Sequence, residues 1–350
     1  MKNRKPLPVL QKIEIIDTGS DGQTVARVDD FVCFVSGAVP GDIVDVQVTR
    51  KKSNYREGKT VHIHTYSEKR DTPFCEHFGI CGGCKWQNMK YEWQLFYKQK
   101  QVEDALKRIA KIASPPISKI IPGKKIKYYR NKLEFTFSNK MWLTDEEIKS
   151  RKVFTDRNAL GFHIPKMFDK VLDIKNCYLQ EFPSNEIRKE LRSFVIENNF
   201  SFYDIREKKG LLRTLIIRTS STGEAMVIVV FGEENFSAEK EKVLRHLAEK
   251  FPEITSLLFL VNTKGNDTIH DLEVQVYKGN SFITEKMHVP AKSGRDLKFR
   301  ISAKSFYQTN SDQAYELYKI VHQFSGLKGH EIVYDLYTGT GTIANFISNS

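Results

Sequence analysis

A cluster of three cysteines is the feature that most restricts how this chain can fold. Cys75, Cys81 and Cys84 lie in the run FCEHFGICGGCKWQ, with the spacing C-x5-C-x2-C. The sequence has only five cysteines, so core packing is a poor explanation for three of them within one short loop. Thiolates spaced in this way are typical of a metal centre. Such a centre makes the chain wrap around it and needs one more ligand from elsewhere.

The two remaining cysteines are the candidates for that ligand. Cys33 lies in the middle of the strand-like run FVCFV, where a cysteine acts as a small buried apolar residue. Cys177 lies in the polar turn DIKNCYLQ, and we predict that it is the fourth ligand. This three-plus-one layout favours a [4Fe–4S] cluster. A zinc ion, which usually takes paired C-x2-C knuckles, and thiols without a metal stay open as alternatives.

The interpretation of the thiols depends on the compartment. The N-terminal run MKNRKPLPVLQKIEII has no apolar stretch of the kind that a signal peptide needs. No segment approaches the roughly 20 apolar residues of a membrane-spanning helix. We therefore expect a cytoplasmic protein without membrane contact, where thiols stay reduced and clustered cysteines indicate metal binding rather than disulfides. We also expect a monomer.

Positive charge is concentrated in the first third of the sequence. Residues 1–130 contain 24 Lys and Arg against 14 Asp and Glu, whereas the remaining residues contain 31 against 29. A localised basic surface attracts polyanions such as RNA or DNA. A lysine-rich surface that only keeps the protein soluble is the alternative.

The pattern of apolar residues divides the 350 residues into three predicted parts. Residues 1–66 alternate short strands with Gly and Pro turns, which predicts a small OB-like β-barrel. Residues 67–300 mix strand and helix patterns and predict a central α/β domain that contains the cysteine loop. Residues 301–350 read as the start of a Rossmann-like domain. Helices are predicted from about 89 to 112, over 184–199 and 238–251, and from Asn310 or Ser311 to Gly326, and a β-hairpin over 213–231.

Two motifs near the end of the sequence contain candidate binding residues. In VYDLYTGTGTIA, a predicted strand ends at Asp335 and leads through Gly339 and Gly341 into a helix, as in the first turn of a nucleotide-binding fold. An acidic residue at this place suits enzymes that use S-adenosylmethionine, although a plain tight turn gives the same pattern. In FRISAKSFYQTN, Phe306 and Gln308 precede a helix, where they could contact a base or a cofactor. Helix capping and core packing explain them equally well.

Taken together and in this order, these motifs resemble the RNA uracil-C5 methyltransferases, over essentially the whole chain. The run GQTVARVDDFVCFVSGAVPGDIVDV and the later NYREG resemble a TRAM domain, an OB-like RNA-binding barrel. The run CEHFGICGGCKWQ resembles the [4Fe–4S] loop of the family branch that methylates 23S ribosomal RNA. A transfer RNA uracil-C5 methyltransferase and a non-catalytic RNA-binding module with a structural metal are the alternatives.

This resemblance implies roles for particular residues. The cluster would be held by Cys75, Cys81, Cys84 and Cys177. The S-adenosylmethionine pocket would be lined by Phe306, Gln308, Asp335, Tyr337, Gly339 and Gly341. In the family mechanism, a cysteine adds to C6 of uracil, and C5 takes the methyl group from S-adenosylmethionine. A base then removes the C5 proton, and the cysteine is eliminated from C6.

The resemblance also implies that the nucleophile and the base lie beyond Ser350. We therefore expect no catalytic residue within this chain, which reads as a fragment of a longer enzyme. We expect it to be inactive by itself and to expose apolar surface near its C-terminus.

Overall fold

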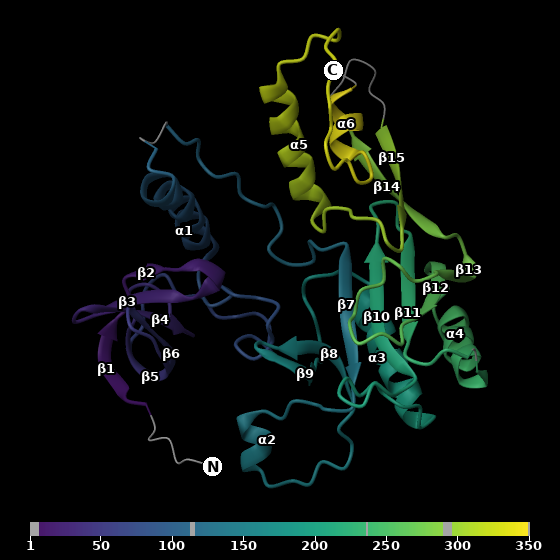
Figure 1. The fold of residues 1–350 in the computed structure, drawn as a ribbon, viewed down its shortest axis with the longest axis horizontal. Helices are drawn as coiled ribbons and strands as arrows, with labels where there is room; N and C mark the ends of the chain where they lie inside the picture. The colour runs from purple at the N-terminus through teal and green to yellow at the C-terminus, as the bar shows by residue number, and fades with distance from the viewer. Residues whose placement is uncertain (1–6, 113–115, 236, 290–295, 349–350) are drawn as a thin grey trace. The chain divides into compact units, whose positions relative to one another are not determined.

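A computed structural model describes residues 7–112, 116–235, 237–289 and 296–348. The chain forms two compact units, Met1–Pro122 and Gly123–Ser350. Figure 1 shows the elements of each unit. The unit boundary falls within the basic part of the sequence, so the first unit has 20 basic and 14 acidic residues and the second has 35 and 29. Each unit therefore carries a net charge of +6, and the excess is shared.

The first unit is built on a six-stranded sheet in the order β1-β5-β6-β4-β3-β2. Alternate side chains of its strands, among them Cys33, Val35, Val44 and Val46, are fully buried in a core of their own. The prediction that Cys33 is a small buried apolar residue is confirmed. The strands are β1 (Val9–Glu14), β2 (Asp17–Thr18), β3 (Thr24–Val28), β4 (Phe31–Ser36), β5 (Ile43–Lys51) and β6 (Tyr55–Thr65).

A buried ion pair connects this sheet to the segment that follows it. Asp42, which is fully buried in the turn before β5, accepts hydrogen bonds from Arg70 at 2.7 and 2.8 Å and from the backbone N–H of Ser67. Helix α1 (Tyr91–Asp104) then packs along the sheet, and its Lys100 bonds Asp17 at 2.6 Å. The helix continues as a π-helical turn over Ala105–Ile109. The helix predicted from about 89 to 112 is thus confirmed in its main part.

The second unit contains a seven-stranded sheet in the order β13-β12-β11-β10-β7-β8-β9. Only the β11–β12 pair is parallel among these neighbours, because their connection runs through helix α4. The predicted hairpin is confirmed as β10 and β11, with Ile216 opposite Ile228. The strands are β7 (Lys132–Ser138), β8 (Ala159–Ile164), β9 (Met167–Asp173), β10 (Leu212–Thr219), β11 (Ala225–Phe231), β12 (Ile254–Val261) and β13 (Gln275–Gly279).

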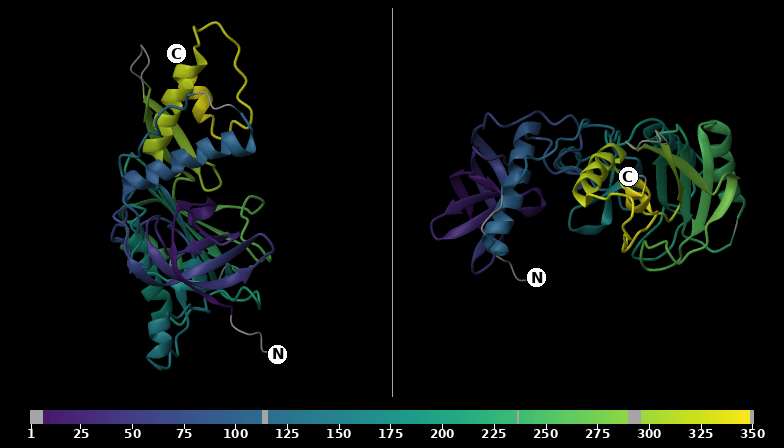
Figure 2. Two further views of the ribbon diagram at one scale, coloured as in Figure 1. Left: turned by 90° about the vertical axis from the view of Figure 1, so that its left-hand side faces the viewer. Right: turned by 90° about the horizontal axis from the view of Figure 1, so that it is seen from above.

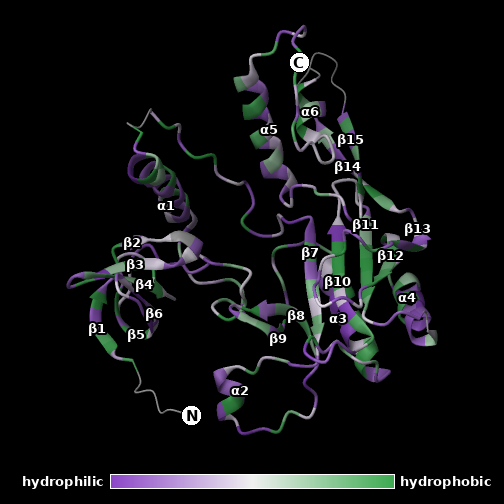
Figure 3. Cartoon of the chain, in the orientation of Figure 1, coloured by the Kyte–Doolittle hydropathy of each residue, from purple (hydrophilic) through white to green (hydrophobic). Residues whose placement is uncertain are grey.

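Both faces of the central strands are covered, which explains their apolar composition (Figure 3). Helices α3 (Ser184–Glu197) and α4 (Ala238–Lys250) cover one face (Figure 2). The other face packs against the hairpin of β14 (Phe282–His288) and β15 (Asp296–Ser302), with Ile228 and Val230 in the shared core. Both helices match their predicted ranges. A short helix, α2 (Asp145–Lys149), has a capping box at Thr144 and Glu147.

The last two helices complete this second layer. Helix α5 (Ser311–Ser325) is capped by Asn310, whose side chain accepts the N–H of Gln313, and it ends at Gly326 with a φ of 60°. These are the predicted helix signals. Helix α6 (Thr342–Ile347) packs Phe346 against Tyr318 of α5. None of the helices in the described part of the chain combines the length and the apolar composition that spanning a membrane requires.

One predicted element is wrong. The sequence predicts a strand ending at Asp335, but residues 331–335 form no strand. A strand needs a neighbour to pair its backbone groups, and no described strand lies beside this segment. Its apolar side chains face solvent, with Ile332 85% and Tyr334 84% exposed. The exposed apolar surface predicted near the C-terminus is therefore present. Residues 311–347 contain the two helices α5 and α6, but the strand predicted between them is absent from this described segment.

Candidate functional site

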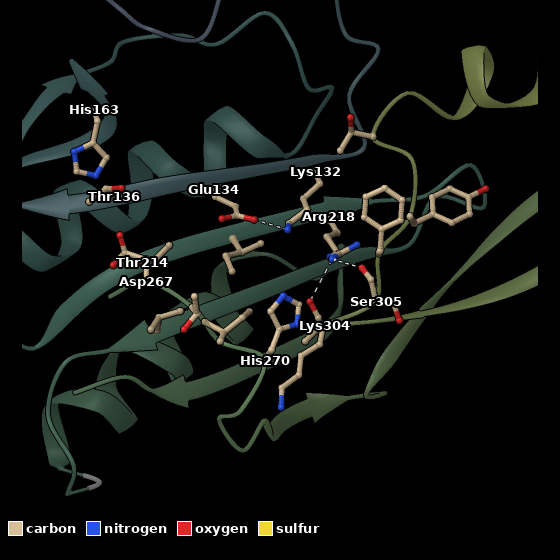
Figure 4. Close-up of a pocket in the computed structure, with 18 residues that line it drawn as sticks. Lys132, Glu134, Thr136, His163, Thr214, Arg218, Asp267, His270, Lys304 and Ser305 are labelled. Carbon is tan, nitrogen blue, oxygen red and sulfur yellow. Dashed lines mark hydrogen bonds and ion pairs between the residues drawn. The ribbon is translucent and has the colours of Figure 1, made fainter. Parts of the chain in front are cut away.

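The second unit contains a cavity of about 610 Å³ against the β14–β15 face of its sheet (Figure 4). Outward side chains of the strands form its floor, and two loops form its walls. We call this cavity the sheet groove. Its lining residues are Lys132, Glu134 and Thr136 of β7, His163 of β8, Thr214, Ile216 and Arg218 of β10, Val230 of β11, residues 267–270, residues 303–307 and Thr309.

Arg218 holds the wall of the sheet groove that contains the motif FRISAKSFYQTN. It is 4% exposed, and its Nη2 donates to the carbonyls of Ala303 at 3.2 Å and Ser305 at 2.8 Å. Its Nε is buried and has no hydrogen-bond partner among the described residues. Burial lowers the pKa of Arg218 to about 10, against the opposing effect of Glu134. The guanidinium therefore stays charged at neutral pH and keeps one donor that has no partner among the described residues.

Asn131 holds the same segment on its other side. Its backbone N–H donates to the carbonyl of Thr309 at 2.8 Å, and its side-chain Nδ2 donates to the carbonyl of Gln308 at 2.8 Å. Nδ2 also donates to Ser311 Oγ at 2.9 Å. The segment is thus fixed to the sheet by side chains that no motif search selects. Phe306, in its middle, stays 73% exposed and is available to a ligand.

The opposite end of the sheet groove is formed by His163, Thr136 and Thr214 (Figure 4). His163 Nδ1 is buried without a hydrogen-bond partner among the described residues. Burial lowers the pKa of His163 below 6.5, although Asp267 and Asp169 oppose this effect. The imidazole is therefore neutral at pH 7, with one donor and one acceptor nitrogen.

A second arginine of β10 holds the loop that borders this end. Arg213 is 2% exposed and donates to the carbonyls of Asn262, Lys264 and Asn266, each at 2.7 Å. It also pairs with the carboxylate of Asp267 at 2.9 Å. Arg213 and Arg218 were not predicted as site residues from the sequence. The available signal was two arginines within the otherwise apolar hairpin LLRTLIIRTS, since a buried arginine requires several acceptors.

The predicted cofactor residues lie in two segments that meet. Phe306 and Gln308 lie in the wall segment, and the carbonyl of Phe306 accepts a hydrogen bond from Thr340 Oγ1 at 3.4 Å. Asp335 does not point toward open space: its carboxylate accepts from Thr338 Oγ1 at 3.0 Å and from the N–H of Ala344 at 3.2 Å. It therefore shapes the loop.

The loop itself leaves room for a ligand. Tyr337, Gly339 and Gly341 all adopt positive φ, and the Tyr337 side chain is fully exposed. Gly341 has a φ of 71°, which favours glycine, and a Cβ there would displace only the flexible end of the Asn345 side chain. The loop thus presents exposed backbone beside Phe306, which fits a nucleotide-like cofactor.

The cysteine loop belongs to the first unit. Cys75, Cys81 and Cys84 are each partly buried, and electrostatic coupling links their thiols. Burial raises the pKa of Cys75 and of Cys81. Backbone N–H groups oppose this shift: those of His77 and Phe78 point at Cys75, and that of Gly83 donates to Cys81 Sγ at 3.4 Å. Amide donors of this kind stabilise thiolates that ligate iron or zinc.

The described residues contain no group of three or more His, Cys, Asp or Glu side chains arranged to hold a metal ion. Cys177 belongs to the second unit, where it is 8% exposed and its backbone exchanges two hydrogen bonds with the Asn185 side chain. The metal centre and its fourth ligand therefore stay predictions.

Comparisons with known proteins agree with the N-terminal prediction. Residues 10–61 match the TRAM domain family. A solved structure titled Pyrococcus abyssi tRNA (uracil-54, C5)-methyltransferase in complex with S-adenosyl-L-homocysteine aligns with 95% of this chain and 69% of its own, with a TM-score of 0.66 and 25% identity.

Relatives found by sequence comparison have a higher sequence identity to this chain than the Pyrococcus protein has. A protein of Bacteroides thetaiotaomicron named an uncharacterized RNA methyltransferase is 53% identical over 331 residues, which cover 94% of this chain and 71% of the relative. A protein of Porphyromonas gingivalis with the same name is 51% identical over 343 residues, covering 96% of this chain and 72% of the relative. The chain described here therefore belongs to the RNA methyltransferases.

Proposed function

We propose that the protein transfers a methyl group from S-adenosylmethionine to C5 of a uracil in RNA. The observation that carries this proposal is the junction of two segments: the exposed Phe306 lies at the motif end of the sheet groove and is bonded to the loop 335–341. A base in the groove and a cofactor at the loop would then be neighbours. The Pyrococcus structure, named for this reaction and solved with S-adenosyl-L-homocysteine, supports it.

The chain's own residues would bind and orient the reactants. S-adenosylmethionine, when bound, supplies an electrophilic methyl group. The exposed backbone at Tyr337, Gly339 and Gly341 would hold it, and Asp335 would keep that loop in shape. Phe306 offers an exposed ring on which a flipped uracil can stack, and Gln308 would contact the cofactor.

The proposed chemistry also needs a nucleophile for C6 and a base for the C5 proton. No cysteine in the described part of the chain lines the sheet groove. The chain spans 71% of the length of the Bacteroides relative, and the expectation that both groups follow Ser350 stays a prediction. So does the expectation that residues 1–350 are inactive alone.

The experiment is a methylation assay. The whole protein would be incubated with S-adenosylmethionine carrying a labelled methyl group and with unmodified 23S ribosomal RNA or transfer RNA, and the nucleosides would be identified by mass spectrometry. The expected product is 5-methyluridine. Phe306→Ala should reduce the rate, whereas Lys250→Gln, an exposed change on α4, should not. Label on another atom or another base would refute uracil-C5 chemistry.

The same assay decides between two RNA substrates. We favour 23S ribosomal RNA because of the sequence resemblance. Transfer RNA is the second candidate, since the Pyrococcus protein is named for that substrate and its alignment covers 95% of this chain, including most of the TRAM region. A TRAM domain therefore does not separate the two. Label in transfer RNA alone would reverse our preference.

The proposal includes a [4Fe–4S] cluster held by Cys75, Cys81, Cys84 and Cys177. The amide N–H groups that point at Cys75 and Cys81 support a thiolate site. The protein would be purified without oxygen and assayed for iron, sulfide and zinc. Cys177→Ser should reduce the iron content, and Cys33→Ser, a change in the core of the first unit, should leave it unchanged. If the purified protein contains stoichiometric zinc and no iron, the cysteines bind zinc and the cluster proposal is wrong.

A further inference from the structure

The sheet groove extends well beyond the motif that contains Phe306. Arg218 and Thr214 both line it and lie four residues apart on β10, roughly 13 Å at about 3.3 Å per residue. This is longer than a single base ring. Figure 4 shows His163 and Thr136 at one end, and Lys132, Arg218 and Ser305 at the other. One base stacked on Phe306 would leave the His163 end unfilled.

The charges of the sheet groove favour a phosphate in the half that lies beside Arg218 and residues 303–307. The two acidic lining residues are already paired: Glu134 with Lys132, and Asp267 with Arg213. The remaining charged lining side chains, apart from the histidines, are Arg218 and Lys304, and the Lys304 ammonium points away from Arg218 (Figure 4). Arg218 is buried, and its Nε is unpartnered among the described residues. A buried cationic donor without an acceptor favours an anionic oxygen ligand.

The far half has the chemistry of a base-binding pocket. The side chains of Thr136, Thr214 and His163 present small polar groups, and Nδ1 of the histidine lacks a partner among the described residues. Ile216, Val230 and Ile269 supply apolar surface between the two ends. A neutral imidazole and two hydroxyls can both donate to and accept from the edge of a base.

We propose that the sheet groove binds two consecutive nucleotides of single-stranded RNA: the target base at Phe306, the phosphate between the two nucleotides at Arg218, and the neighbouring base against His163. The identity of the ligand as RNA rests on the proposed function. The groove thus makes the enzyme sensitive to the nucleotide beside its target.

Binding of a uridine dinucleotide tests this assignment. Its affinity would be measured by calorimetry at low salt, without cofactor, together with two versions in which either the 5′ or the 3′ base is absent. His163→Ala should weaken binding of the complete dinucleotide about tenfold, the usual cost of losing one base contact. His163→Ala should leave the affinity for one of the two abasic forms unchanged, because that form lacks the base that His163 contacts. Phe306→Ala should show the same pattern with the other abasic form.

Controls keep folding separate from binding. Thr136→Val retains a β-branched residue on β7 and removes only the hydroxyl, so it should follow His163→Ala in direction if the far end holds a base. His330→Ala, a change at a histidine whose side chain is 80% exposed outside the groove, should change nothing. Thermal melts would confirm that each variant is folded.

Two results would overturn the assignment. If the effects of His163→Ala and Phe306→Ala on affinity both disappear with the same abasic form, one nucleotide fills the whole groove. If His163→Ala weakens all three ligands equally, or none, the far end contacts no base. Because the measurement requires no methyl transfer, a whole protein that methylates no uracil C5 but shows the expected dependence on each base would refute the proposed function and leave the two-nucleotide groove intact.

Discussion

At the scale of single residues, buried polar side chains rather than motif residues shape the candidate site. Arg213 and Arg218 place carbonyl-rich loops on the sheet, and Asn131 fixes the segment that carries Phe306 and Gln308. Asp335, predicted as a cofactor ligand, bonds its own loop. A sequence pattern marks residue types but does not state which atoms they will bond, so the positioning residues were not predicted, and the cofactor contact of Asp335 stays a prediction.

His163 should make stability depend on pH. Burial lowers its pKa in the folded state below 6.5, so the unfolded chain binds more protons at mildly acidic pH. The contribution of His163 to stability is therefore complete above its unfolded pKa and is lost as pH falls through 6.5 toward the folded value. Urea unfolding at about pH 7.5 and about pH 5 should show a smaller loss for His163→Gln than for the wild type. Equal losses would show that His163 does not titrate differently on folding.

At the scale of elements, amphipathic helices and the hairpin were predictable because their signals are local. Helix α5 combines a cap at Asn310, a helical apolar stripe and a stop at Gly326, and the structure has all three. The strand predicted to end at Asp335 was wrong because pairing decides strand formation, and a partner strand is not a local property. Local sequence patterns therefore predicted the helices more accurately than this strand.

The cap of α5 gives an element-scale prediction. Asn310→Ala removes the acceptor for the N–H of Gln313 and should lower the free energy of unfolding by about 1 kcal/mol. Asn310→Asp keeps an acceptor at the same place and should stay within a few tenths of the wild type. Chemical denaturation of both variants checks this. If the two variants lose equal stability, the cap is not the source of the effect.

At the scale of the whole molecule, the basic excess belongs to both units, so RNA contacts are expected on each. The sequence located the excess in residues 1–130 but could not show that the unit boundary falls inside that range. Four of those basic residues, Lys124, Lys125, Lys127 and Arg130, belong to the second unit. The TRAM match covers residues 10–61 and leaves them outside.

Salt dependence should report the contribution of the first unit. Lys51 and Lys52 are exposed at the end of β5, within the TRAM region. Changing both to Gln should reduce the slope of log affinity for single-stranded RNA against log salt by about 1.4, since each phosphate contact contributes about 0.7. Lys250→Gln, on the sheet face opposite the groove, should leave the slope unchanged. An unaltered slope in the double variant would show that RNA does not contact Lys51 and Lys52.

The two arginines of β10 have a consequence for how quickly a substrate is accepted or rejected. Both loops that border the groove are fastened to one strand before any RNA arrives. Walls that are ordered in advance lose little conformational entropy on association, so affinity depends mainly on the fit of the incoming nucleotides. A poorly fitting neighbour then cannot be accommodated by loop movement, and such an RNA should dissociate faster while its rate of association stays nearly the same.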